Sequence, residues 1–446
     1  MSMRVASLIL SVFLVANSTL SAQSADARLK TIARQISAQR IERDLRTIVG
    51  FGTRHTLSDT LSATRGIGAA RRWVKSEFDR IASSCGGCLE VRYQPRVWKA
   101  DGNRLVRDVN IVNVLAIFRG SSEPGRVVFM TAHLDSRASN ANDTLTDAPG
   151  AADDGSGVAA VIETARVLAS AAPFHKTVIL AALSGEEQGL YGGQQLAQMA
   201  RDSGWIVEGV LNNDIIGNAR GMTGEANTHT FRVFSEPVPV DETDQQRRAR
   251  RASGGEIDGP SRQLARYVDR ITARYVPGAD AVMIYRLDRF GRGGDHRAFN
   301  DLGFPAVRFT VMNEDYNRQH QDVRTENGIS YGDVIEEISF PYIARVASAN
   351  ATSLASLAWA PPPPDSVRIK GAVTPSTTFT WNAPSSPSLA GYRIYWRETT
   401  EPQWRYHADV GLANSFTLTN VNIDNYFFGV ASLGRDGTES VVVFAH

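Results

Sequence analysis

Apolar residues recur along much of the chain at the spacing of an amphipathic helix. Residues 66–83, for example, place Ile67, Ala70, Val74 and Phe78 three or four positions apart, which puts them on one helical face. The predicted helices cover residues 26–48, 66–83, 156–171 and 190–203. This pattern indicates helices that pack against a core on one side.

Short apolar runs alternate with these helices and predict strands. The predicted strands cover residues 110–118, 126–135, 176–183, 207–216 and 305–311. Alternation of apolar strands with amphipathic helices is typical of an α/β fold. We therefore expect a mixed, mostly parallel sheet that is covered by helices on both faces, within one domain of residues 23–358.

The pattern changes after this domain. The proline run within residues 359–366 predicts a semi-rigid linker that cannot continue a helix. Residues 367–446 then show short alternating strands separated by turn residues, which predict an all-β sandwich. With Trp381 in its second strand and Tyr426 in its sixth, this sandwich resembles a fibronectin type III domain.

Residues 1–22 have the layout of a secretory signal peptide. Arg4 precedes an apolar stretch from Val5 to Ala16, and small residues follow up to Ala22. The stretch is too short for a stable membrane span, and a retained N-terminal anchor is the alternative. We expect secretion to an extracellular or periplasmic compartment, with no membrane span in the mature protein.

The charged residues are balanced over the chain and gather in one polar segment. The chain has 446 residues with 48 Lys and Arg against 47 Asp and Glu, a formal net charge of +1. This balance gives no field of one sign that would suggest a nucleic-acid or membrane partner. Residues 235–260 are rich in arginine, and we expect a polar insertion loop there rather than a binding patch, because no aromatic residue interleaves the arginines.

The chain has two cysteines, Cys85 and Cys88, which stand in the sequence SSCGGC. A C-x-x-C pair suits a redox site, half of a zinc site or a disulfide. No further cysteine or histidine with zinc-site spacing is near, and exported proteins meet oxidising conditions. We expect a disulfide that closes the glycine turn, with free thiols as the alternative.

Histidine and acidic residues gather where apolar strands of the first domain finish. They are His133 and Asp135, Asp153 and Asp154, Glu186 and Glu187, and Asp214. Open α/β sheets bind their ligands in the crevice at the carboxyl ends of the strands, so we expect these side chains to converge. Imidazole and carboxylate donors without a thiolate suit zinc or manganese.

The spacing within each pair predicts a role for its members. His133 and Asp135 are two residues apart and point the same way on an extended segment, so that the carboxylate can orient the imidazole. Asp153 and Asp154 are consecutive and point apart, so we expect only one of them to bind metal. The binding carboxylate, at the start of a helix, is suited to bridge two ions.

The same geometry separates Glu186 from Glu187. If Glu187 binds a metal, Glu186 is free to act as a general base toward a water molecule, whose pKa a metal lowers from about 15.7 to roughly 7. Each motif alone has a structural explanation, such as a solvated loop or a helix cap. Their occurrence at successive strand ends favours a metal site.

The order of these motifs resembles family 28 of the metallopeptidases, the secreted co-catalytic zinc aminopeptidases. The matching segments are AHLDS, PGAADDGSG, SGEEQGL, NND, GGDHRAFNDLGFPA and YNRQHQDVRTENG, within residues 28–355. The resemblance implies the zinc exopeptidase fold, two Zn²⁺ ions, Glu186 as the general base and Asp135 as the partner of His133. The metal ligands that it implies are His133, Asp153, Glu187, Asp214 and His320, with Asp153 bridging the two ions.

Three further details follow from the resemblance. His296 is expected near the site without binding metal, and the peptide bond between Asp153 and Asp154 is expected to be strained and often cis. His320 departs from the family pattern, because this ligand normally stands in a Tyr-x-His or x-His-Thr context and the chain reads RQHQD.

Three carboxylate ligands carry −3 against +4 from two divalent ions, and an added hydroxide brings the set to neutrality, so the charge count favours two ions.

The expected activity is the removal of N-terminal residues from peptides with free N-termini by a secreted dinuclear zinc aminopeptidase. One alternative on the same fold is a glutaminyl cyclase. Another is a carboxypeptidase or dipeptidase, in which Arg318 and Arg324 beside His320 would neutralise a substrate carboxylate. A non-enzymatic, receptor-like ectodomain is disfavoured because every expected ligand and the base are present. The C-terminal domain is expected either to contact a surface or polymer or to serve as a passive spacer.

Overall fold

The computed structural model describes residues 24–446. The predicted signal peptide therefore lies outside the described residues. Within this part of the chain, no helix combines the length and the apolar character that crossing a bilayer requires.

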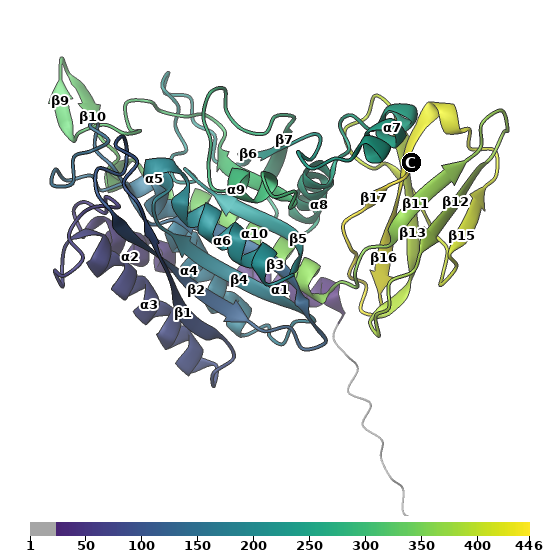
Figure 1. The fold of residues 1–446 in the computed structure, drawn as a ribbon, viewed down its shortest axis with the longest axis horizontal. Coiled ribbons are helices and arrows are strands. Elements are labelled where there is room, and N and C mark those ends of the chain that lie inside the picture. Colours follow the sequence, from purple (N-terminus) through teal and green to yellow (C-terminus); the bar gives the residue numbers. More distant parts are fainter. Residues whose placement is uncertain (1–23) are drawn as a thin grey trace, which may run out of the picture.

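A mixed eight-stranded sheet runs through the larger domain (Figure 1). In spatial order its strands are β1 (Glu90–Trp98), β2 (Val109–Phe118), β4 (Lys176–Leu183), β3 (Glu123–His133), β5 (Ile206–Asn213), β8 (Ala306–Val311), β6 (Thr230–Ser235) and β7 (Asp280–Ile284). The central strands β4, β3, β5 and β8 are parallel to one another. β2 pairs antiparallel with both of its neighbours, and β6 pairs antiparallel with β8. The carboxyl ends of the central strands therefore meet at one edge of the sheet.

Helices cover both faces of this sheet, because side chains alternate between two cores along each strand. In β4, Leu180 belongs to one core, and its neighbours Ile179 and Ala181 belong to the other. The helices on the first face are α1 (Ala25–Gln35), α2 (Ala38–Val49), α3 (Gly66–Ser84), α4 (Ser156–Ala169), α8 (Pro260–Tyr275) and α10 (Phe340–Trp359), and those on the second are α6 (Tyr191–Asp202) and α9 (His296–Asn300). The predicted α/β class is confirmed.

The predicted helix over residues 26–48 is two helices. Ile36 has an extended backbone after α1, and the side chain of Ser37 accepts a hydrogen bond from the backbone N–H of Arg40. A serine at this position is a favoured N-cap, so it starts α2 in a new direction. The spacing of apolar residues continues across the break, which is why the sequence pattern does not reveal it.

An all-β body follows α10 and forms a sandwich. One sheet consists of β11 (Asp365–Lys370), β12 (Thr377–Asn382) and β15 (Ser415–Leu418), and the other of β14 (Tyr406–Asp409), β13 (Leu389–Glu398), β16 (Tyr426–Gly434) and β17 (Val443–Phe444). All pairings within both sheets are antiparallel. Phe379, Tyr392 and Phe428 fill the core between the sheets. A separate hairpin of β9 (Arg324–Glu326) and β10 (Ile329–Tyr331) projects from the larger domain.

The sandwich docks on the larger domain through a buried ion-pair cluster. Asp258 accepts hydrogen bonds from Arg266 Nη1 at 2.7 Å and from Arg397 Nη2 at 2.8 Å. Arg266 belongs to α8 and Arg397 to β13, and at most 1% of any of the three side chains is exposed. Trp404 of the sandwich also donates a hydrogen bond to Gln263 of α8 at 3.2 Å. Buried ion pairs therefore join the two bodies.

The polar segment of residues 235–260 is part of this junction. It contains α7 (Asp244–Ser253), which begins with a capping box between Thr243 and Gln246. No residue of α7 is buried, so the sequence carries no apolar pattern that would predict this helix. The segment is thus a helix beside the sandwich (Figure 1) followed by the buried Asp258, rather than a loop throughout.

The proline run between the two bodies is packed rather than extended into solvent. α10 ends at Trp359, and Pro361, Pro362 and Pro364 are all buried. On the same side of the molecule, Arg28 of α1 pairs with Asp436 of the sandwich. The linker is therefore part of the interface between the larger domain and the sandwich.

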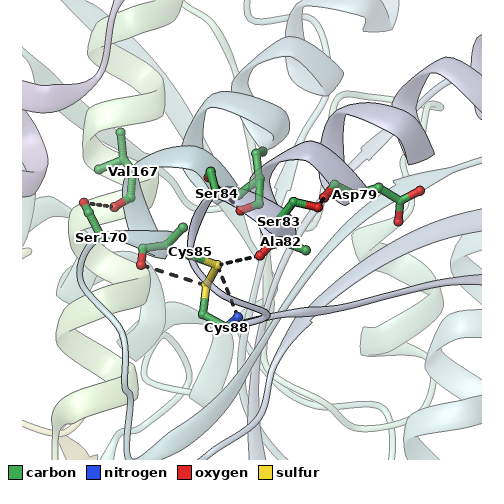
Figure 2. The surroundings of a disulfide bond; sticks show 10 residues. Asp79, Ala82, Ser83, Ser84, Cys85, Cys88, Val167 and Ser170 are labelled. Carbon is green, nitrogen blue, oxygen red and sulfur yellow. Dashed lines mark hydrogen bonds between the residues drawn. A yellow bond between two sulfur atoms is a disulfide. The ribbon is translucent and has the colours of Figure 1, made fainter.

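A disulfide joins Cys85 to Cys88 directly after α3 (Figure 2). The turn that it closes contains Gly86 and Gly87, whose φ angles are 68° and 84°. Residues other than glycine rarely adopt this left-handed conformation. The turn leads the chain from α3 into β1.

Replacing Asp258 by Asn should lower the free energy of unfolding by about 3–5 kcal/mol, because it leaves two buried guanidinium groups without a counter-charge. Urea denaturation monitored by tryptophan fluorescence measures this change. The matched control is Asp409→Asn, since Asp409 pairs with Arg393 but is 53% exposed; its expected cost is below about 1 kcal/mol. Equal costs for the two variants would contradict an energetic role for the buried junction.

Candidate metal centre

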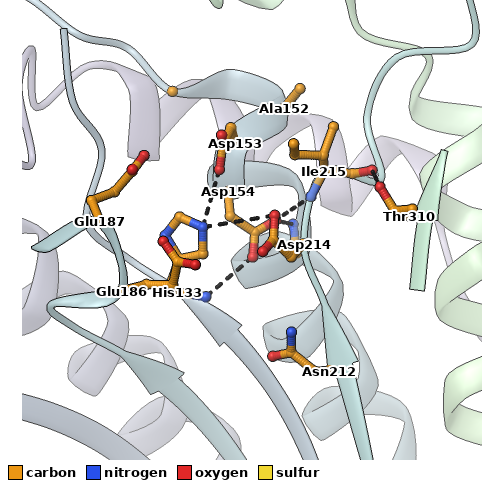
Figure 3. Close-up of polar contacts among 12 residues, drawn as sticks. His133, Ala152, Asp153, Asp154, Glu186, Glu187, Asn212, Asp214, Ile215 and Thr310 are labelled. Carbon is orange, nitrogen blue, oxygen red and sulfur yellow. Dashed lines mark hydrogen bonds and ion pairs between the residues drawn. The ribbon is translucent and has the colours of Figure 1, made fainter. Parts of the chain in front are cut away.

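The acidic and histidine side chains that the sequence predicts as metal ligands converge at the carboxyl edge of the central strands. Figure 3 shows these ligands except His320, together with Glu186. They are His133 at the end of β3, Asp153 in η1 (Ala151–Gly155) before α4, Glu186 and Glu187 in α5 (Glu186–Gly189) after β4, Asp214 directly after β5, and His320 between β8 and β9. Except for His320, which lies in a loop, each of them lies at or near the point where a regular element ends or begins. The topology of the sheet thus brings residues from distant parts of the chain into one site.

Two groups of potential metal donors share the carboxylate of Asp153. Its Oδ1 lies 3.0 Å from Nε2 of His133, and its Oδ2 lies 3.1 Å from Nε2 of His320. Asp214 completes the first group and Glu187 the second, and within each group the donor atoms all lie within 4.8 Å of one another. Oε1 of Glu187 is 3.1 Å from Nε2 of His320, close to the spacing of about 3.3 Å between donors around a tetrahedral zinc ion.

His133 is held in the tautomer that a metal ligand requires. Its Nδ1 lies 2.9 Å from the backbone carbonyl of Asp135. A carbonyl can only accept, so Nδ1 carries a hydrogen, and in the neutral ring Nε2 then keeps its lone pair. Nε2 is buried, has no hydrogen-bond partner and faces the shared Asp153 carboxylate.

The Asp135 carboxylate does not make the expected hydrogen bond to the His133 ring. Its Oδ1 is 3.7 Å from Nδ1 of His133, beyond hydrogen-bond range, and the backbone carbonyl orients the ring instead. The carboxylate accepts hydrogen bonds from the backbone N–H groups of Glu186 at 3.3 Å and Glu187 at 3.1 Å, and from the hydroxyl of Thr56 at 2.8 Å. Asp135 therefore fixes the start of α5, and with it the two glutamates.

Asp154 points away from the donors and ties three backbone segments together. Its carboxylate accepts N–H groups from His133 at 3.1 Å, Gly157 at 3.0 Å and Ile215 at 3.4 Å. These residues lie at the end of β3, in α4 and directly after Asp214. The Asp153–Asp154 peptide bond is cis. The Asp153 side chain belongs to the donor groups, whereas the Asp154 side chain binds backbone N–H groups.

Glu186 and Glu187 leave the short α5 in different directions (Figure 3). Glu187 is buried and faces His320, whereas Glu186 is half-buried. Burial raises the pKa of the Glu186 carboxyl well above its ordinary value, and the neighbouring Asp214 and Glu187 carboxylates raise it further. A carboxylate with a raised pKa is a stronger proton acceptor than an exposed one.

The loop that carries His320 is held by a buried carboxylate, Glu314. Glu314 accepts hydrogen bonds from Arg232 at 2.6 Å, Arg292 at 2.8 Å and Gln319 at 2.9 Å. Gln319 directly precedes His320, whose backbone has a φ of 52°, in the left-handed region that non-glycine residues seldom occupy. In the sequence RQHQD, the glutamine before His320 thus links this histidine to Glu314. The sequence alone does not reveal that contact.

Two buried residues that sequence reasoning missed hold the segment around Asp153. Asp333 accepts the backbone N–H groups of Ala152 at 2.8 Å and Asp153 at 2.7 Å. Arg54, fully buried, donates to the carbonyls of Leu134 at 2.7 Å and Gly150 at 3.0 Å. Asp333 lies 180 positions from Asp153 in the sequence, and no local pattern marks either residue.

Two arginines beside the donors were also missed. Arg308 is fully buried on β8 and pairs with Oδ1 of Asp214 at 2.7 Å. Arg137 pairs with Oε2 of Glu187 at 3.1 Å. A signal for Arg137 existed, because it stands two residues after the Asp of the AHLDS motif.

Three residues that the sequence placed near the site are engaged elsewhere. His296 is buried with its Nε2 2.9 Å from the carbonyl of Leu287, so it stays outside the donor groups. Arg318 pairs with Glu337 at 2.9 Å. Arg324 pairs with Glu326 at 3.2 Å on the projecting hairpin. Neither arginine is thus a free cation for a substrate carboxylate.

The donor set fits zinc. It combines two imidazoles with three carboxylates and no thiolate, a composition that suits zinc. One imidazole has a buried, unpartnered nitrogen, and one carboxylate presents its two oxygens to the two groups. Fold and site together define a metal centre of the kind found in α/β metallohydrolases.

Comparison with known proteins agrees with this class. The model of peptidase family M28 matches residues 113–338. A probable zinc metalloprotease of Leptosphaeria maculans is 44% identical over 420 residues, which cover 94% of this chain and 97% of that protein. A probable zinc metalloprotease of Pyrenophora teres f. teres is 42% identical over 425 residues, 95% of this chain and 87% of the other.

A solved structure shows the same fold. The Legionella pneumophila LapA aminopeptidase superimposes with a TM-score of 0.54 at 18% sequence identity, covering 75% of each chain. The chain belongs to peptidase family M28 and is a metallopeptidase, as the matched family and the relatives named as zinc metalloproteases show.

Replacing Glu314 by Gln should weaken zinc binding at the His320 group by about 10–100-fold, the usual effect of removing a residue that orients a ligand. Calorimetric zinc titration of metal-depleted protein measures this change. Glu337→Gln is the matched control, because Glu337 pairs with Arg318 in the same region and is 39% exposed. Unchanged zinc binding in Glu314→Gln would show that the Glu314 contacts do not position His320.

Proposed function

We propose that the protein is a secreted dinuclear zinc aminopeptidase that removes N-terminal residues from peptides. The observation that supports it most directly is the position of the Asp153 carboxylate, whose two oxygens lie within 3.1 Å of histidine nitrogens in separate donor groups. A carboxylate placed in this way suits a bridge between two cations. In this proposal His133 and Asp214 hold one zinc ion, and Glu187 and His320 hold the other.

The proposed chemistry divides the work between the ions and the side chains. Zinc bound in these groups would supply a Lewis acid for the scissile carbonyl and lower the pKa of water. Glu186 is the residue proposed to move protons. Its carboxylate accepts a proton from the attacking water and passes it to the departing nitrogen as the C–N bond breaks. The products are a free amino acid and a peptide that is one residue shorter.

The residues around Glu186 support this role. Asp135 holds its backbone N–H at 3.3 Å, which fixes the direction in which the side chain leaves α5. Burial and the nearby carboxylates raise its pKa, which strengthens it as a base.

The alternatives receive less support. The carboxypeptidase or dipeptidase alternative relied on Arg318 and Arg324, and both are paired with glutamates away from the donors. The glutaminyl cyclase reading uses a single zinc ion, which leaves one of the two donor groups without a purpose. A receptor-like ectodomain has no need for converging donors or for a base beside them.

The location and the C-terminal domain are part of the proposal. The layout of residues 1–22 supports export to an extracellular or periplasmic compartment. Two antiparallel sheets of three and four strands support a fibronectin type III-like sandwich. Its buried junction with α8 favours a fixed companion of the peptidase domain over a free module, and its outer surface remains a candidate for contact with a surface or polymer.

Glu186→Gln should keep its zinc and lose at least about 100-fold in kcat toward aminoacyl 4-nitroanilides, because the amide cannot accept the proton of water. Zinc content by elemental analysis and initial rates measure both quantities on one sample. Near-normal turnover would remove Glu186 as the base.

The direction of cleavage is tested with matched substrates on the native protein. Leucine 4-nitroanilide with a free amine should be hydrolysed, and its N-acetylated counterpart should not. Efficient hydrolysis of the acetylated substrate would contradict the aminopeptidase assignment.

A further inference from the structure

A short segment between α2 and α3 reaches the donor groups through buried polar side chains. His55 and Thr56 belong to this segment, and both contact Gln188 of α5, the residue that follows Glu187. At most 4% of His55, Thr56 or Gln188 is exposed. Buried polar groups are almost always hydrogen-bonded, so each donor and acceptor among them needs a partner.

The His55 ring is fixed in one neutral form. Its Nδ1 accepts the backbone N–H of Leu57 at 3.0 Å, so Nδ1 carries no hydrogen. Its Nε2 lies 2.9 Å from the backbone carbonyl of Ala141, which can only accept, so Nε2 carries the hydrogen. The ring therefore has one acceptor, at Nδ1, and one donor, at Nε2.

This form of His55 determines how the Gln188 amide is turned. Nε2 of Gln188 lies 3.0 Å from Nε2 of His55, and two N–H groups cannot form a hydrogen bond with each other. A half-turn of the amide exchanges its nitrogen and its oxygen, and it is the surrounding hydrogen bonds that distinguish the two ends. Turned in this way, the amide offers its oxygen to the Nε2–H of His55. The turn gives up a contact of 3.3 Å with the carbonyl of Ala141, which His55 already binds at 2.9 Å.

The turned amide also determines where the Thr56 hydroxyl points. The other end of the Gln188 amide contacts Oγ1 of Thr56, and after the turn this end is the nitrogen, so Thr56 accepts from it. A hydroxyl has a single hydrogen to donate, and that of Thr56 is left for Oδ2 of Asp135, at 2.8 Å. The hydrogen bonds thus run in one direction, from His55 through Gln188 and Thr56 to Asp135.

We propose that Thr56 is a positioning residue for the hydrolytic site and acts through the Asp135 carboxylate on the two glutamates of α5. This inference rests on the proposed function. Oδ1 of Asp135 accepts the backbone N–H of Glu186 at 3.3 Å, and Oδ2 accepts that of Glu187 at 3.1 Å. Thr56 binds the same Oδ2. Its hydroxyl therefore holds the carboxylate that holds both the proposed base and a proposed metal ligand.

The Thr56 hydroxyl matters because Asp135 is fully buried. A hydrogen bond to a charged carboxylate is stronger than one between neutral groups. Without it, the carboxylate is free to turn away from the N–H groups at the start of α5. A shift of Glu186 would then affect the reaction directly, because proton transfer requires the base within hydrogen-bond reach of the proton.

The first test compares Thr56→Val with Thr56→Ser at saturating zinc. Valine has the shape of threonine without the hydroxyl, so kcat toward leucine 4-nitroanilide should fall at least about tenfold, as expected for the loss of a hydrogen bond to a charged group. KM should change little, because Glu186 acts in the transition state rather than in substrate binding. Thr56→Ser keeps the hydroxyl and should retain most of the activity. An equal loss in both variants would overturn the proposal, because the loss would then come from packing.

Thr352→Val is the matched control. Thr352 is also buried, and its hydroxyl donates to the carbonyl of Ser348 within α10 at 2.7 Å. This variant should keep the kcat of the native protein, and urea denaturation measures how much stability each valine variant loses. If Thr56→Val and Thr352→Val had the same kcat, the proposal would be wrong.

Nitrogen NMR of the histidine rings tests the direction of the hydrogen bonds in the native protein, whether or not Thr56→Val folds. His55, identified by the signals that His55→Gln protein lacks, should carry its hydrogen on Nε2. A hydrogen on Nδ1 would remove the reason for turning the Gln188 amide and would overturn the proposal.

Zinc binding separates this inference from the proposed function. Calorimetric titration of metal-depleted Thr56→Val protein should show zinc affinity lowered at least about tenfold, because Glu187 depends on Asp135 for its position. Thr56→Ser should bind zinc as the native protein does. If the native protein hydrolyses no substrate with a free amine, the proposed function fails, while the zinc comparison still decides the role of Thr56. Native zinc affinity in Thr56→Val contradicts that role.

Discussion

The site depends on one carboxylate that serves two groups of donors at once. Asp153 places one oxygen 3.0 Å from His133 and the other 3.1 Å from His320. With Glu187 and Asp214 close by, this arrangement gathers negative charge inside the protein, where uncompensated charge is costly. Divalent cations in both groups would relieve the repulsion, so the charge of the site and its proposed chemistry have the same physical origin.

Buried carboxylates that bind backbone N–H groups hold this arrangement in place. Asp154 joins the ends of β3 and β5 to α4, Asp135 fixes α5, and Asp333 fixes the turn that carries Asp153. Each binds at least two N–H groups, so the donors other than His320 are oriented through the backbone rather than through side-chain packing alone. Small shifts in these contacts would reach the donors directly, because each contact lies within a few residues of one.

The sequence predicts the parts of this protein that follow local patterns. The parallel strands, the flanking helices and the donor motifs all follow from hydrophobic runs and from the residues at their ends. Contacts between distant segments do not: Asp258 meets Arg397 across 139 positions, and Glu314 holds His320 only through Gln319. The helix α7 is not predicted for a different reason: an exposed polar helix has no apolar face that a sequence pattern would show. Arg137 stands next to a recognised motif, but its contacts are with Glu187 and His320, which lie far away in the sequence.

The most direct test of the account is anomalous diffraction at the zinc edge from crystals of the zinc-loaded protein. The account predicts two peaks on opposite sides of the Asp153 carboxylate, one beside His133 and Asp214 and the other beside Glu187 and His320. A single peak, or peaks away from these donors, would contradict the shared carboxylate on which the rest of the account depends.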